Sequence, residues 1–121
     1  MEVVNPYDQL TAQERERVSK LFDDVLPFYT RIAVGVPDKG FIGAHHESCV
    51  RMALAGKQAV SSLTDVKPED AIYSDDHFAR CIEYAWQHSL TESDKVFLNE
   101  HLRHAAECFR IGFMLADLPE L

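Results

Sequence analysis

The sequence predicts an all-α fold, a single-domain bundle of four helices. Apolar residues recur at spacings of three and four along most of the chain, which is the period of one helix face. Two segments open with a capping box, a local signal for a helix start, and no stretch of four or more residues alternates as a strand would. A chain of 121 residues with no long polar linker can build one core, so we expect one domain over residues 1–121.

The first predicted helix begins at Thr11. In Thr11-Ala-Gln-Glu14 the threonine hydroxyl can accept from a free backbone amide, and the glutamate can reach back to the cap. An apolar stripe then continues from Val18 to Ile32. Pro27 lies inside this stripe and removes a helical hydrogen bond, so we expect the first helix to be kinked at Pro27.

The second predicted helix covers residues 44–63, and the third runs from Ser74, a good N-cap, to about His88. A loop over 64–73 separates them. Ala53, Gly56 and Ala59 on the second helix are small enough to let another backbone approach closely. The apolar stripe of the third helix consists of Phe78, Cys81, Ile82, Ala85 and Trp86.

The fourth predicted helix starts at a second capping box, Thr91-Glu-Ser-Asp94, and continues to about Asp117. Its apolar arc is wider than one packing face needs. We therefore expect this helix either to be central in the bundle or to meet another copy, and we predict a homo-oligomer.

Charge and hydropathy narrow the function classes. Twenty acidic and twelve basic residues give a net charge of −8, and the basic residues are scattered rather than clustered, so we predict no direct nucleic-acid binding. The longest apolar run, 111–116, is far too short to span a bilayer, and the first residues lack the pattern of a signal peptide. Three cysteines without a CxxC spacing suit a reducing compartment and small buried side chains. We therefore expect a cytoplasmic protein that does not bind membranes.

The start of the second helix is a candidate anion site. Helix N-termini attract anions, and Gly43 precedes His45 and His46, so backbone amides there can be closely approached. Arg51 is near in sequence, and Arg103 and Arg110 of the last helix are candidate phosphate partners. The alternative is a glycine-rich loop that only turns the chain.

Metal binding and catalysis are weaker hypotheses. His101, His104 and Glu107 share a spacing of three on the last predicted helix, and imidazole and carboxylate suit zinc or iron. However, the Glu-x-x-His pairs and His-Glu-x-x-His motif of known metal-binding helices are absent, so capping or exposed histidines are the alternative. No nucleophile motif is present either, and we predict a non-catalytic protein without a cofactor.

Both ends of the chain carry short motifs that resemble one family. Tyr7-Asp-Gln-Leu-Thr-Ala-Gln-Glu14 and Arg103-His-Ala-Ala-Glu-Cys-Phe-Arg-Ile-Gly-Phe-Met114 are similar to the helical hairpin of phage anti-CBASS sponge proteins and their anti-Thoeris relatives. The resemblance covers about a third of the chain and does not extend to residues 34–93. It implies an oligomeric viral immune-evasion protein that sequesters cyclic nucleotides without cleaving them, in the cytoplasm of a host bacterium. Tyr7, Phe109, Gly112 and Phe113 are the positions that match.

Three hypotheses follow. The first is a non-catalytic sponge for a cyclic nucleotide or similar phosphorylated small molecule, with Tyr7, Gly43, His45, His46, Arg51, Arg103 and Arg110 as ligand-binding residues. The second is an acidic protein–protein inhibitor or adaptor of anti-CRISPR type, which acts on a host protein and needs no small ligand. The third is a helical metal-binding protein that uses His101, His104 and Glu107.

Overall fold

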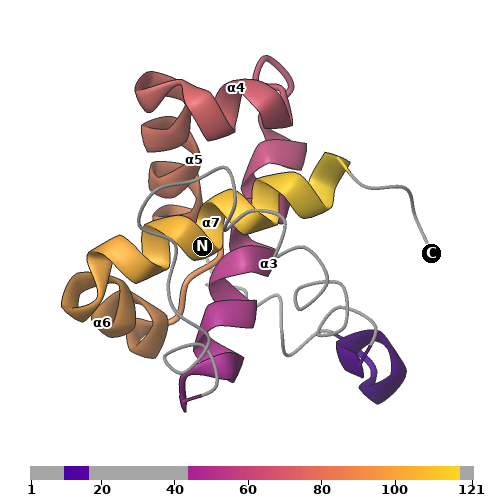
Figure 1. Cartoon of the computed structure of the whole chain (residues 1–121), viewed down its shortest axis with the longest axis vertical. Coiled ribbons are helices and arrows are strands. Elements are labelled where there is room, and N and C mark those ends of the chain that lie inside the picture. Colours follow the sequence, from indigo (N-terminus) through magenta and orange to yellow (C-terminus); the bar gives the residue numbers. More distant parts are fainter. Residues whose placement is uncertain (1–9, 17–43, 118–121) are drawn as a thin grey trace.

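The computed structural model describes residues 10–16 and 44–117 (Figure 1). These residues form helices and contain no strand, which confirms the all-α class. The helices are α3 (His46–Ser62), α4 (Pro68–Tyr73), α5 (Asp75–His88), α6 (Glu92–Glu100) and α7 (Leu102–Asp117), and a helical turn covers 12–16. None of the helices in this part of the chain is long and apolar enough to cross a membrane. The predicted kink at Pro27 lies outside the described residues.

Both predicted capping boxes are present. The Thr11 N–H donates to Glu14 Oε1 at 3.0 Å, and the Glu14 N–H donates to Thr11 Oγ1 at 3.2 Å. At the start of α6, the Thr91 N–H donates to Asp94 Oδ2 at 3.2 Å and the Asp94 N–H donates to Thr91 Oγ1 at 3.1 Å. Four backbone amides that the helices leave unpaired are satisfied in this way. The two helix starts were therefore predicted correctly.

The last predicted helix is interrupted at His101. This residue has φ −130° and ψ 48°, which is not helical, and it closes α6 before α7 begins at Leu102. The single helix over 91–117 was therefore wrong. Nothing in the local sequence announces the break, because neither glycine nor proline stands there.

The predicted loop over 64–73 contains the short helix α4. Pro68 occupies its first position, where the missing N–H costs nothing and the fixed φ suits a helix. A helix of six residues is too short to show an apolar stripe, and so the periodicity did not reveal it. Ser74 then ends α4 and precedes α5, but its side chain forms no capping bond; its Oγ lies 2.9 Å from His77 Nδ1.

α3 is one of the two most extensively packed helices of the described part. It packs against α5, α6 and α7, and Figure 1 shows α7 running across it. Five consecutive residues, Met52 to Gly56, are buried, so every face of this stretch is covered. A helix that is buried all round belongs in the interior of a fold. α7 likewise packs against three helices, α3, α4 and α6, so α3 and α7 share the interior of the described part.

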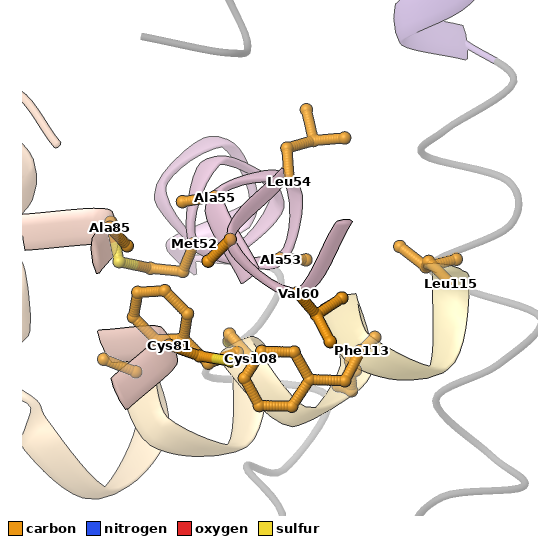
Figure 2. Close-up of a cluster of buried hydrophobic side chains, with 14 of the residues drawn as sticks. Met52, Ala53, Leu54, Ala55, Val60, Cys81, Ala85, Cys108, Phe113 and Leu115 are labelled. Carbon is orange, nitrogen blue, oxygen red and sulfur yellow. The ribbon is translucent and has the colours of Figure 1, made fainter. Parts of the chain in front are cut away.

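The core lies where α3, α5 and α7 meet (Figure 2). Met52 and Ala53 come from α3, Cys81 from α5, and Cys108 and Phe113 from α7. All three cysteines of the chain are free and buried, as the sequence predicted. Burial raises the pKa of the Cys81 thiol to about 11. A hydrogen bond with Cys49, together with burial, raises the pKa of Cys108 well above its ordinary value.

Two glycines bring α3 and α7 into close contact. A Cβ on Gly112 would lie 2.8 Å from the carbonyl carbon of Ala53 and 3.0 Å from its Cα, with the carbonyl oxygen nearer still. A Cβ on Gly56 would lie 2.7 Å from the Phe109 carbonyl oxygen. Carbon atoms prefer separations of about 3.5–4.0 Å, so neither position has room for a side chain. The close approach predicted for Gly56 is confirmed.

Candidate functional site

The start of α3 holds a cluster of three rings. His45 occupies the N-cap position of α3, and its side chain makes no capping hydrogen bond. Its ring centroid lies 5.2 Å from that of His101 and 5.6 Å from that of Phe97, and the Phe97 and His101 centroids are 5.2 Å apart. Packing of α3 against α6 thus joins one residue of the predicted anion site to one residue of the predicted metal set. The sequence assigned these two histidines to separate candidate sites.

The Arg51 guanidinium forms hydrogen bonds with three side chains of the protein. Its Nε donates to Asp94 Oδ1 at 2.7 Å, its Nη1 to Glu47 Oε1 at 2.8 Å, and its Nη2 to Ser48 Oγ at 3.3 Å. The Asp94 side chain is only 1% exposed. Removing one partner of a buried ion pair leaves a charge without compensation, which costs about 3–5 kcal/mol. These contacts tie α3 to α6 and use donors on all three guanidinium nitrogens.

The two arginines of α7 differ in their surroundings. Arg110 donates through Nη1 to Glu107 Oε1 at 2.7 Å, and its guanidinium carbon lies 4.3 Å from the centroid of the Phe78 ring. Arg103 is exposed. Tyr7 and Gly43, the other predicted ligand-binding residues, lie outside the described residues. Among the predicted ligand-binding residues, His45 lies next to His101, which belonged to the predicted metal ligands, and His46 is the first residue of α3.

The predicted metal ligands do not form a common site. Within residues 10–16 and 44–117, no three or more His, Cys, Asp or Glu side chains are grouped so that they could hold a metal ion. The spacing argument assumed one continuous helix, but the break at His101 removes that residue from the face of α7. Glu107 is buried instead, with Oε1 on Arg110 and Oε2 without a hydrogen-bond partner.

An open apolar pocket of about 390 Å³ lies between α5 and the two last helices. Its lining is almost wholly carbon, and Glu83 is its only charged member. Phe78, Ile82 and Trp86 belong to the predicted apolar stripe of the third helix, yet they are only half-buried, and Leu102 is 63% exposed. The surplus width of the last helix's apolar arc was the signal that pointed to this face. The pocket is lined by Phe78, Ala79, Ile82, Glu83, Trp86, Leu98, Leu102, Ala106 and Phe109.

Two of the three aromatic rings that line this apolar pocket, Trp86 and Phe78, each have a cation over one face. The Lys95 ammonium lies 5.2 Å from the Trp86 ring centroid, and Arg110 covers Phe78. Both cations are already paired with carboxylates, Lys95 with Glu92 at 3.6 Å and Arg110 with Glu107. Because each cation is paired with a carboxylate, the two cations add no net positive charge to the pocket. The pocket is therefore suited to an apolar surface rather than to a phosphate.

Comparison of the chain with protein-family models, with curated proteins and with solved structures gives no match. The resemblance to the sponge proteins stays a prediction. Three of the positions that match have a packing role in this fold, since Phe109, Gly112 and Phe113 are all buried where α7 contacts its neighbours.

Proposed function

We propose that the protein is a non-catalytic binding protein that acts by docking another protein, as an inhibitor or adaptor. The observation that carries this proposal is the apolar pocket between α5 and the last two helices, which is lined in part by the exposed side chain of Leu102. Exposed apolar surface of this kind, bordered by polar residues, is typical of sites that meet another protein. The acidic net charge of −8 supports the same proposal, because it favours electrostatic attraction of a basic partner.

The surroundings of the predicted phosphate-binding arginines support the choice of a protein over a phosphorylated ligand. Arg51 and Arg110 each donate to a buried carboxylate at 2.7 Å. A phosphate would have to compete with these carboxylates, and would meet them as like charges. An apolar protein surface at the pocket leaves both ion pairs undisturbed.

Site-specific photocrosslinking tests the proposal. A photoreactive phenylalanine analogue placed at Leu102, in the native cell, should crosslink to another protein, because this side chain stands at the pocket and is 63% exposed. The matched control is the same analogue at Tyr73 of α4, a large exposed side chain that does not line the pocket. Crosslinks from position 102 that are absent from position 73 would support the proposal. Equal products at both positions, or none at either, would refute it.

A second candidate function is the capture of a phosphorylated small molecule at the start of α3. It is favoured by the ring cluster, which places the His45 and His101 imidazoles 5.2 Å apart at the N-terminus of a helix, the end that attracts anions. A ligand at a hundredfold excess over its Kd would stabilise the fold by roughly 3 kcal/mol. Thermal shift with cyclic di- and trinucleotides and cyclic ADP-ribose isomers tests this, using a His45→Ala/His46→Ala double variant as the control. No shift with any member would exclude it for these ligands.

A further inference from the structure

One apolar stripe at helical spacing faces the pocket, and apolar residues of α6 and α7 face it from the other side. Phe78, Ile82 and Trp86 follow one another four residues apart on α5. On the other side, Leu98 at the end of α6 and Leu102 and Ala106 of α7 line the pocket, on either side of the break at His101. Eight residues of helix correspond to about 12 Å, or somewhat more than two turns. An amphipathic helix presents apolar side chains at i, i+3 or i+4, and i+7 over the same length, and apolar grooves bind such helices through these anchors.

The charges on the three helices that line the pocket indicate the sign of the partner. Lys95, Arg80 and Arg110 are paired with carboxylates, and buried Asp94 is paired with Arg51. The exposed charged side chains described on α5, α6 and α7 that enter no ion pair are four carboxylates and one guanidinium, so they leave a net charge of −3 with histidine neutral. They are Asp75, Asp76, Glu83, Glu100 and Arg103.

We propose that the apolar pocket docks an amphipathic helix of a partner protein that carries Lys or Arg beside its apolar anchors. Glu83 lines the pocket and has no ion-pair partner among the described residues, so it meets one of these basic side chains. The apolar anchors lie against Phe78, Trp86 and Leu102. This inference rests on the proposed function, because it names the chemistry of the protein that the pocket docks.

Trp86 makes the inference directly measurable. It is the only tryptophan of the chain and it lines the pocket, so its emission reports on what covers it. The probe is an 18-residue helical peptide of Leu and Lys without Trp, and its counterpart replaces every Lys with Glu. The Leu/Lys peptide should shift the Trp86 emission to shorter wavelength and saturate. Equal binding of the Leu/Glu peptide would overturn the proposal.

Two charge reversals separate Glu83 from the overall charge of the protein. Glu83→Lys should weaken the Leu/Lys peptide by roughly tenfold, since one attraction becomes a repulsion, and should strengthen the Leu/Glu peptide. Glu69→Lys changes the net charge equally, but Glu69 is exposed on α4 and does not line the pocket. It should change either affinity by less than about twofold. If both variants lose affinity equally, binding follows overall charge and the proposal is overturned.

A dilution series without peptide tests the other occupant, a second copy of this chain. Trp86 emission that changes with protein concentration, in step with the sedimentation coefficient, would show that another copy covers the pocket and would overturn the proposal. The inference and the proposed function can fail separately. Crosslinks at position 102 combined with no response to the Leu/Lys peptide would refute only the inference that the partner is a basic amphipathic helix. Peptide binding without specific crosslinks would refute the proposed function, which is docking of another protein in the cell.

Discussion

The close contact between α3 and α7 predicts that Gly112→Ala destabilises the protein. The new Cβ would lie 2.8 Å from the Ala53 carbonyl carbon, at least 0.6 Å inside an ordinary contact of about 3.4 Å, and nearer still to the oxygen. These are main-chain atoms of a helix, so no side chain can rotate away. Relief requires α3 and α7 to separate along their shared interface.

The magnitude follows from two opposing terms. Overpacking in a core costs about 1–3 kcal/mol, and an obstacle made of backbone belongs at or above the upper end of that range. Replacing glycine by alanine inside a helix returns about 1 kcal/mol. We therefore expect Gly112→Ala to lower the free energy of unfolding by about 2 kcal/mol or more. For a domain of this size the Tm should fall by about 6–12 °C.

Urea titration and thermal unfolding monitored by circular dichroism measure this effect. Ser61→Ala is the matched control, because Ser61 is exposed on α3 and its substitution should stay within about 0.5 kcal/mol. Gly56→Ala should cost less than Gly112→Ala, since its nearest obstacle is a single carbonyl oxygen at 2.7 Å. A Gly112→Ala variant as stable as the wild type would refute the reasoning. So would rescue by Ala53→Gly, which leaves the obstructing main-chain atoms in place.

Three other outcomes are expected. Asp94→Ala should destabilise the fold by about 3 kcal/mol in urea titration, since it removes the buried carboxylate that pairs with Arg51 and that accepts from the Thr91 N–H, whereas exposed Glu92→Ala should cost under about 0.5 kcal/mol. Burial raises the pKa of the Cys81 thiol from 9.0 to about 11, so the stability that the neutral thiol contributes is complete below about pH 9 and is lost as the pH rises towards 11. Cys81→Ala should therefore reduce the fall in stability measured between pH 8 and 10.5. A fall as large as that of the wild type would contradict this cause. Leu102→Glu should leave the Tm within about 2 °C, because the side chain is exposed, yet should abolish peptide binding measured by Trp86 emission.

Local signals in the sequence predicted the helix starts well. The capping boxes at Thr11 and Thr91 need only residues three positions apart, and both formed as expected. The apolar spacing also placed α3 and α5, because an apolar stripe records which side of a helix is buried. It failed at His101, where the direction of the chain changes without any glycine or proline to mark it.

The candidate site depended on contacts that no spacing contains. Arg51 was chosen as a phosphate partner because it follows two histidines in the chain. Its actual partner, Asp94, lies 43 residues away, and the sequence had offered that residue only as a cap. His45 meets His101 for the same reason, since α3 packs on α6. Partners at such separations are set by helix packing.

The sequence by itself determined the all-α class, the two capping boxes and the burial of the three cysteines. Each of these follows from residue type and from neighbours within one or two helical turns. Only the tertiary structure decided that α3 is covered on every face from Met52 to Gly56 and that Leu102 lies exposed at an open apolar pocket. The physical reason is that apolar periodicity shows which face of a helix avoids water, but does not show whether neighbouring helices are close enough to cover that face.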